Sequence, residues 1–241
     1  MVYRTLTKYF NNKKAFALLI DPDKHNNKTL IKTVSLANKA KVDFIFVGGS
    51  LMSVNIEESI KIIKENCSIP VILFPGSLLQ ISLNADAILL LTLISGRNPD
   101  LLIGNHVIAA NILKKSQIEI LSTGYMIIEN GKTTSVEYMS NTKPIPRDKV
   151  DIAVATAIAG EMIGNKLIYM EAGSGALVPI NTNMISEVKK NISVPLIVGG
   201  GLKTEKDIKV VCKAGADVIV IGNAIEKDTS FIEKASEIIH S

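Results

Sequence analysis

Eight short apolar runs recur along this chain, and most are separated by segments with the spacing of amphipathic helices. Runs that are apolar throughout are typical of strands buried on both faces. Their alternation with helices predicts parallel strands joined by right-handed crossovers. Eight such units close most simply into an α/β fold, a (β/α)8 TIM-like barrel, with an open doubly wound sheet as the alternative. The runs are Ala15 to Asp21, Val42 to Gly49, Pro70 to Gly76, Ala87 to Ser95, Glu119 to Ile128, Lys166 to Gly173, Pro195 to Gly201 and Ala216 to Asn223.

The length of the chain agrees with one such barrel. It has 241 residues, of which 47% are hydrophobic, and a barrel of this class takes about 250 residues as a single domain. No linker or low-complexity tract interrupts the sequence. We therefore expect residues 1–241 to form one domain.

The repeat is broken in two places. Between Gly76 and Ala87 there is room for only about two turns of helix, fewer residues than a crossover usually needs. The third helix is therefore expected to be short or missing. After the fifth run, Asn130 and Gly131 lie between two alternating segments, which is a two-residue hairpin signal. We expect a β-hairpin here, extending over the C-terminal mouth of the barrel.

Composition excludes several classes of protein. The formal net charge is +4, a mild surplus that suits a small anionic ligand better than nucleic acid. The longest apolar run, Ala87 to Ile94, is far shorter than the roughly 20 residues of a membrane-spanning helix. The N-terminus lacks the features of a secretory signal, so we expect a cytoplasmic protein. Cys67 and Cys212 have no metal or disulfide spacing and are expected to be reduced thiols.

Two strand ends near the C-terminus carry glycines, at Gly199 to Gly201 and at Gly222. Each follows a β-branched run and precedes a helical segment, an arrangement in which backbone N–H groups can meet a phosphate. Glycine permits the close approach because it has no side chain. The pattern predicts a phosphate site built by the last two strands, although two tight turns that bind nothing remain the alternative.

Oxygen ligands for a metal ion follow the first two strands. Asp21 ends the first run at the barrel mouth, where a carboxylate can hold Mg²⁺ that is shared with substrate phosphates. Ser50 follows the second run on the same rim. Its hydroxyl is either a second oxygen ligand or a helix N-cap.

A glutamate stands in the otherwise apolar sixth run. Burying a carboxylate without a partner is costly, so Glu171 is expected to have a ligand, a partner or a raised pKa. It is our candidate for a general base or a hydroxyl-binding group, with an ion pair to a lysine inside the barrel as the alternative. Tyr169 is a second catalytic candidate, because its hydroxyl would lie within reach of the same ligand, with packing as the alternative. Gly173, Ser174 and Gly175 offer main-chain donors to an anion.

Arg97 follows the fourth run on the same rim. Its planar guanidinium suits phosphate oxygens, which makes a diphosphate contact and a solvated loop equally plausible interpretations.

Taken in order, these segments resemble the geranylgeranylglyceryl phosphate synthases, a family of prenyltransferases that includes the bacterial heptaprenylglyceryl phosphate synthases. The resemblance covers nearly the whole chain, through Asp21 to Lys24, Val47 to Ser50, Ser95 to Pro99, Tyr125 to Pro146, Tyr169 to Gly175, Gly199 to Gly201 and Gly222 with Asn223. It implies a modified barrel that transfers a prenyl group, with Mg²⁺, from its diphosphate to the C3 hydroxyl of sn-glycerol 1-phosphate. The product would be an ether-lipid precursor.

The resemblance also implies roles for individual residues. It makes Asp21 and Ser50 the Mg²⁺ ligands and implies a homo-oligomer, either a dimer or a hexamer. It assigns the following residues to the glycerol phosphate: Tyr169, Met170, Glu171, Ala172, Gly173, Ser174, Gly175, Gly200, Gly201, Gly222 and Asn223.

One position departs from the heptaprenyl branch of the family. That branch has a phosphate-contacting lysine two places before the metal aspartate, whereas this chain has Leu19. We therefore expect a C20, geranylgeranyl donor. The rival functions are a phosphosugar isomerase or lyase on the same barrel and a non-catalytic protein that binds a phosphate ligand.

Overall fold

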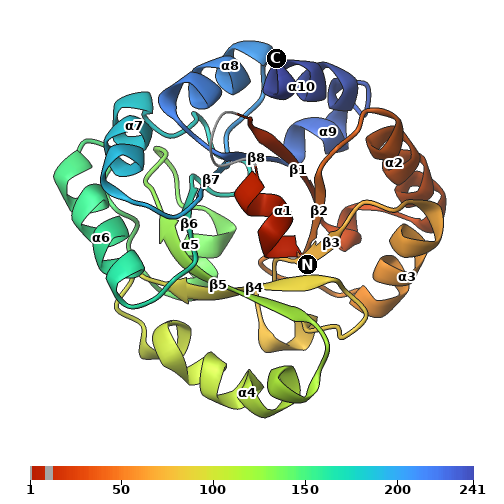
Figure 1. The fold of residues 1–241 in the computed structure, drawn as a ribbon, viewed down its shortest axis with the longest axis horizontal. Helices are drawn as coiled ribbons and strands as arrows, with labels where there is room; N and C mark the ends of the chain where they lie inside the picture. Colours follow the sequence, from red (N-terminus) through yellow and green to blue (C-terminus); the bar gives the residue numbers. More distant parts are fainter. Residues whose placement is uncertain (1, 9–12) are drawn as a thin grey trace.

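The computed structural model describes residues 2–8 and 13–241, and these form a closed barrel of eight parallel strands (Figure 1). The strands pair in sequence order, and β8 pairs with β1 to close the cylinder. All eight strands lie within the runs expected from the sequence. Their bounds are β1 Ala15–Ile20, β2 Phe44–Val47, β3 Val71–Leu73, β4 Ala87–Leu93, β5 Glu119–Ile127, β6 Leu167–Glu171, β7 Leu196–Gly199 and β8 Val218–Ile221.

Most of the helices surround the barrel as an outer ring (Figure 1). Local signals set their ends. In α8, for example, the Thr204 side chain accepts a hydrogen bond from the Asp207 N–H, and Gly215 ends the helix with a φ of 109°. The helices are α1 Val2–Lys8, α2 Asn27–Lys39, α3 Ile56–Asn66, α4 Asn105–Lys115, α5 Ser135–Ser140, α6 Val150–Met162, α7 Thr182–Asn191, α8 Glu205–Ala214, α9 Asn223–Lys227 and α10 Phe231–His240.

Helix α1 packs across one end of the cylinder (Figure 1). Leu6 is fully buried and belongs to the apolar cluster inside the barrel. The Glu119 carboxylate, at the start of β5, accepts hydrogen bonds from the N–H groups of Val2 and Tyr3. Since strands begin at this end, α1 covers the amino-terminal end of the barrel and leaves the carboxyl ends of the strands for a ligand.

An aromatic cluster fills the barrel beneath the carboxyl ends of the strands. Tyr169 stacks on Phe74 with ring centroids 5.2 Å apart, and Tyr125 meets Tyr169 edge-on at 5.3 Å. Phe46 lies against Phe74 at 6.4 Å. These rings are held by packing, so they provide a rigid floor for whatever binds above them.

The third crossover helix is missing, as the sequence predicts. A single 3-10 turn, η2 (Leu78–Gln80), stands in its place between β3 and β4. A π-helical turn, η3 (Asp100–Gly104), leads into α4. The outer face of β4 therefore lacks the helix that would normally cover its β3 side.

The prediction of a β-hairpin at Asn130 and Gly131 is wrong. The chain instead forms the short helix α5, and the two sides of the segment meet only at an isolated parallel bridge between Ile128 and Ile145. The Thr134 side chain and Glu137 form a capping box, which favours a helix over a second strand. Asn130 is 3% exposed and donates from Nδ2 to the Ala172 carbonyl at 2.5 Å. Asn130 therefore anchors this segment to the backbone that follows β6, and it is not a hairpin turn residue.

Two further predictions concern the cysteines and membrane-spanning helices. Cys67 and Cys212 are both free thiols, as expected. Within the part of the chain that the structure describes, no helix has the length and apolar character needed to cross a bilayer.

Candidate active site

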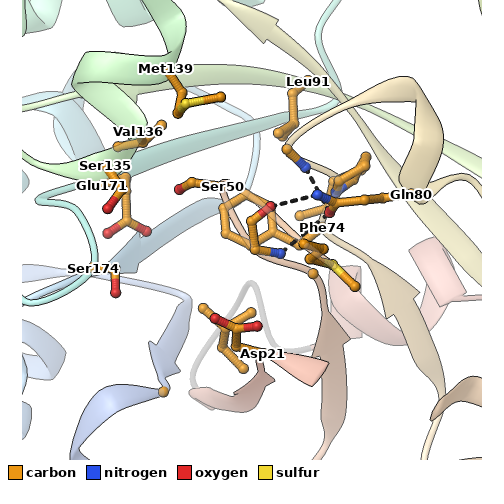
Figure 2. Close-up of a pocket in the computed structure, with 18 of the residues that line it drawn as sticks. Asp21, Ser50, Phe74, Gln80, Leu91, Ser135, Val136, Met139, Glu171 and Ser174 are labelled. Atoms are coloured by element: carbon orange, nitrogen blue, oxygen red, sulfur yellow. Dashed lines mark hydrogen bonds between the residues drawn. The ribbon is translucent and has the colours of Figure 1, made fainter. Parts of the chain in front are cut away.

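A cavity of about 780 Å³ opens at the carboxyl ends of the strands. Its walls come from loops that are far apart in sequence, among them the segments after β1, β2, β3, β6, β7 and β8. Figure 2 shows Glu171 and Ser174 on one side of this cavity, Ser50, Phe74 and Gln80 on the other, and Asp21 below them in the view. The closed barrel thus brings most of the residues selected from the sequence to one place.

The glycines of the β6 and β7 loops hold backbone groups close together. Gly200 has a φ of 82°, and a β-carbon on it would lie 2.9 Å from the Ala172 nitrogen and 2.7 Å from the Gly173 nitrogen. Gly201 has a φ of 72°, and a β-carbon there would lie 2.6 Å from the Val178 carbonyl oxygen. No side chain fits at either position. These glycine-bearing loops form a rim of the cavity, the glycine rim, where a ligand can approach the backbone without an intervening side chain.

Asn223 links this rim to the loop after β8. Its Oδ1 accepts hydrogen bonds from the Ser174 hydroxyl at 3.1 Å and from the Gly175 N–H at 3.3 Å. Helix α9 begins at Asn223, with Gly222 as its N-cap. Gly201, Gly222, Asn223, Ser174 and Gly175 all line the cavity, so the glycine-bearing loops predicted from the sequence do meet.

Glu171 is a buried carboxylate at the end of β6. It is 6% exposed, and Oε1 accepts a hydrogen bond from the Gly173 N–H at 2.7 Å. Burial raises the pKa of this carboxyl, although the nearby Tyr169 hydroxyl and the Gly173 N–H both act to lower it. Within residues 2–8 and 13–241 no lysine or arginine forms an ion pair with Glu171. The alternative prediction, an ion pair between Glu171 and a lysine inside the barrel, is therefore not supported by the described residues.

Tyr169 lies below the cavity and does not line it. The side chain is fully buried, and burial raises the pKa of its hydroxyl well above the usual value, so Tyr169 is a neutral donor. A β-carbon on Gly199 would lie 2.7 Å from this hydroxyl and 3.0 Å from Glu171 Oε2, which places the two groups side by side. Met170 and Ala172 pack into the cluster between the sheet and the outer helices, so they do not face the cavity with their side chains.

Asp21 and Ser50 lie on adjacent loops. A β-carbon on Gly49 would lie 3.3 Å from both Cγ and Oδ1 of Asp21, so the carboxylate faces the residue that precedes Ser50. Asp21 Oδ1 accepts a hydrogen bond from the Asp23 N–H at 3.1 Å. Burial is the main cause that raises the Asp21 pKa. A cation would compensate this buried negative charge, so the two oxygen donors fit Mg²⁺, which commonly takes one or two carboxylates and completes its shell with water and phosphate.

Glu226, on α9, is a residue of this mouth that sequence reasoning missed. It lines the cavity, and its Oε2 accepts a weak hydrogen bond from Asn223 Nδ2 at 3.4 Å. Burial and then the nearby Asp21 carboxylate raise its pKa. The only available signal was its position three residues after Asn223, which does not distinguish it from a solvated surface charge.

Arg97 lies elsewhere. Its Nη1 donates to the carbonyl oxygens of Ile94 at 3.3 Å and Gly96 at 2.7 Å, and the residue does not line the cavity. Lys24, which we did not select from the sequence, does line it. The structure therefore does not bring Arg97 together with the other predicted residues.

An apolar groove continues from the mouth over the outer face of β4. Ile88 and Leu90 belong to the cluster outside the sheet, whereas Leu89 and Leu93 point into the barrel. Leu78 and Ile81, around η2, and Ala109, on α4, complete the groove. It lies where the missing third helix would pack, so the short connection and the groove have a single cause.

Known proteins resemble this chain over almost its full length. A family model described as the PcrB family matches residues 9–240. The geranylgeranylglyceryl phosphate synthase of Chitinophaga pinensis is 53% identical over 229 residues, covering 95% of this chain and 91% of that protein. That of Pyrococcus furiosus is 42% identical over 96% of this chain and 92% of its own length. The crystal structure of (S)-3-O-geranylgeranylglyceryl phosphate synthase from Thermoplasma acidophilum, in complex with the substrate sn-glycerol-1-phosphate, superposes with a TM-score of 0.94 at 32% identity, covering 100% of this chain and 98% of that one.

Proposed function

This chain belongs to the PcrB family, and on that basis we propose that it transfers a geranylgeranyl group from its diphosphate to the C3 hydroxyl of sn-glycerol 1-phosphate. The carbon–oxygen bond between the prenyl C1 and the diphosphate breaks, and an ether bond forms between C1 and the acceptor oxygen. The hydroxyl proton and diphosphate are released. The observation that carries the proposal is one cavity that joins an anion-binding glycine rim, a buried carboxylate and an apolar groove.

The acceptor phosphate is assigned to the glycine rim. Gly173, Gly175, Gly201 and Gly222 all line the cavity, and the substrate-bound relative from Thermoplasma acidophilum carries sn-glycerol-1-phosphate. Main-chain donors that are fixed before the ligand arrives need little reorganisation when it binds. The rim would therefore hold the phosphate in place and aim the rest of the acceptor at Glu171.

Glu171 is assigned to the acceptor hydroxyl. A carboxylate whose pKa is raised by burial is a better proton acceptor near neutral pH than an exposed one. Its Oε1 is fixed by the Gly173 N–H, and Oε2 lies beside the Tyr169 hydroxyl. In the proposed reaction Glu171 positions the hydroxyl in line with the prenyl C1 and takes its proton as the ether bond forms.

Asp21 and Ser50 are assigned to Mg²⁺. Their fit rests on the half-buried carboxylate beside Gly49 and on the hydroxyl that follows it. The ion, when bound, supplies positive charge for the leaving diphosphate. Asp21 then contributes its carboxylate, and Lys24 adds a cation on the same rim.

The prenyl tail is assigned to the groove along β4. Its walls are aliphatic side chains around Ile88, Leu90 and Ala109. Burying a methylene contributes about 0.8 kcal/mol, so a C20 tail would supply most of the donor affinity. A phosphosugar isomerase has no use for such a groove. An isomerase of this kind also needs an acidic residue at the end of the fifth strand. Among the residues of β5, Tyr125 alone lines the cavity, and it is not an acid of that kind.

Assembly and location follow from weaker signals. Ile103, Val107, Ile108 and Ile112 are 56 to 68% exposed on η3 and α4, which supports the homo-oligomer, a dimer or a hexamer, that the family resemblance implies. A cytoplasmic location stays a prediction from the sequence.

The function is tested by supplying sn-glycerol 1-phosphate with C15, C20 and C35 prenyl diphosphates and Mg²⁺, and identifying the product by mass spectrometry. We expect geranylgeranylglyceryl phosphate as the main product. Conversion of a phosphosugar, or binding of glycerol phosphate without any transfer, would instead establish one of the rival functions.

A further inference from the structure

Gln80 is the last residue of the turn that replaces the third helix, and its side chain is buried beneath the mouth of the barrel. It is 4% exposed. Burying an amide is favourable only where its oxygen and nitrogen are both hydrogen-bonded. Its partners lie on the loop after β2, which carries Ser50, and on the loop after β3, and Figure 2 draws the Gln80 side chain with its hydrogen bonds dashed.

The Gln80 amide holds two loops at once. Its Oε1 accepts hydrogen bonds from the Gly49 N–H at 3.3 Å and from the Gly76 N–H at 3.0 Å. Its Nε2 donates to the Gly49 carbonyl oxygen at 2.7 Å. Gly49 is therefore fixed through both its N–H and its carbonyl, and the loop after β2 is joined to the loop after β3.

Gly49 faces one of the two proposed oxygen ligands and precedes the other in the chain. Its α-carbon faces the Asp21 carboxylate, and Ser50 follows it in the chain. A β-carbon on Gly76 would lie 3.0 Å from the Ser50 α-carbon, so the two loops touch at that residue as well. Any movement of Gly49 would change the position of Ser50 relative to Asp21.

Few side chains can do this. The site needs two accepted hydrogen bonds and one donated bond within the reach of a single side chain, and glutamine supplies both kinds of group. An ionised glutamate would place an oxygen against the Gly49 carbonyl. Methionine has similar length but forms none of the three bonds.

We propose that Gln80 is a positioning residue for the Mg²⁺ and diphosphate half of the active site. Gln80 also lines the cavity, and in this proposal it acts by holding Gly49, and through Gly49 the position of Ser50, beside Asp21. This role of Gln80 rests on the proposed function, because the proposed function places the prenyl diphosphate in this half of the mouth. The acceptor half, built on β6, β7 and β8, does not depend on Gln80.

The test is Gln80→Met, measured separately on the two halves of the mouth. Loss of groups that orient metal ligands typically lowers affinity or activity by about 10- to 100-fold. We therefore expect the KM for geranylgeranyl diphosphate and the half-saturating Mg²⁺ concentration to rise by about tenfold or more. The Kd for sn-glycerol 1-phosphate, measured by calorimetry without donor, is expected to stay within about twofold.

Ser82→Ala is the matched control. Ser82 is also fully buried in this connection, but its hydroxyl donates to Glu57 Oε2 at 2.8 Å, away from Gly49, and it does not line the cavity. This variant loses a buried hydrogen bond without touching the mouth. Equal losses in Ser82→Ala, an unchanged donor KM in Gln80→Met, or an equal loss of acceptor affinity would each overturn the proposal.

A second measurement uses the unmodified protein and does not require the variant to fold. Hydrogen exchange without ligands is expected to show protected amides at Gly49 and Gly76, and rapid exchange at both would overturn the proposal. If the unmodified protein transfers no prenyl group, the proposed function fails, whereas the exchange result still decides whether Gln80 holds the two loops.

Discussion

The Glu171 carboxylate is held at 2.7 Å by the N–H of Gly173, two residues further along the chain. The buried acid and the glycine-rich phosphate loop are thus one local unit. The group proposed to face the acceptor hydroxyl is therefore tied to the loop proposed to hold the acceptor phosphate.

Replacing Glu171 by glutamine tests its role in proton transfer. The amide keeps the shape of the carboxylate and can still accept from Gly173, but it cannot take a proton. We expect turnover to fall by on the order of 100-fold or more, with the KM for sn-glycerol 1-phosphate changed much less. Steady-state kinetics measure both quantities, and an unchanged turnover would show that Glu171 is not the base.

The same substitution has a predictable effect on stability. Because burial raises the Glu171 pKa, the folded state binds this proton more tightly than the unfolded state does. The stability that the protonated Glu171 carboxyl contributes is present below the pKa that it has in the unfolded state. This stability is lost as pH rises through the pKa that it has in the folded state. We expect Glu171→Gln to become progressively more stable than the unmodified protein as pH rises through that window. Urea denaturation from pH 4 to 8 measures this, and a difference that shrinks with rising pH would contradict the assignment.

Asp21→Asn tests the metal site. Asparagine retains an oxygen that can accept from the Asp23 N–H, so the fold is expected to remain intact, but the negative charge is gone. We expect Mg²⁺-dependent turnover to fall by about 100-fold or more, while the Kd for sn-glycerol 1-phosphate stays within about twofold. Kinetics at varied Mg²⁺ give the first value and calorimetry the second. Full activity in this variant would remove Asp21 from the site.

Gly201→Ala tests the glycine rim, with Gly164→Ala as its control. Both glycines have positive φ, at 72° and 97°, and alanine in this conformation costs about 1–2 kcal/mol. Around Gly164 the space is open, whereas a β-carbon on Gly201 would meet the backbone of Val178 and Pro179 within 3 Å. We expect Gly164→Ala to lose stability only, and Gly201→Ala to lose more stability and at least tenfold in acceptor affinity. Similar acceptor affinity in both variants would argue against a phosphate at this rim.

Ala109→Phe tests the groove. Ala109 is 3% exposed and lines the groove opposite Ile88, so a larger side chain would occupy space assigned to the tail. Overpacking is expected to cost about 1–3 kcal/mol of stability. The ratio of turnover with the C20 donor to turnover with the C15 donor serves as an internal control. We expect that ratio to fall by about tenfold, and an unchanged ratio would place the tail elsewhere.

The barrel could be predicted from the sequence because its strands are buried on both faces. Each strand then reads as a continuous apolar run, and the number and order of the runs define the sheet. The same reasoning selected Asp21, Ser50 and Glu171, and the structure brings them to one cavity because barrel topology places strand ends together. The pair Asn130 and Gly131 misled because its turn propensity is local, whereas the Asn130 side chain is hydrogen-bonded to the Ala172 carbonyl, just after β6.

Other parts of the site could not be predicted. Gln80 and Glu226 carry no sequence signal, since a glutamine after two leucines and a glutamate near the last helix resemble ordinary turn and surface residues. Their importance depends on contacts across loops, such as Gln80 with Gly49. The place of the apolar groove along β4 could not be predicted either, because alternate residues of β4 face opposite sides and only the coordinates show which side the missing helix leaves open.

The central claim is that two anionic head groups occupy separate halves of one barrel mouth. A crystal structure with sn-glycerol 1-phosphate, Mg²⁺ and an unreactive sulfur analogue of geranylgeranyl diphosphate tests it most directly. We predict the acceptor phosphate against the N–H groups of Gly201 and Asn223, the diphosphate beside Asp21 and Ser50, and the tail along Ile88. Head groups in exchanged positions, or a tail outside the β4 groove, would contradict the account.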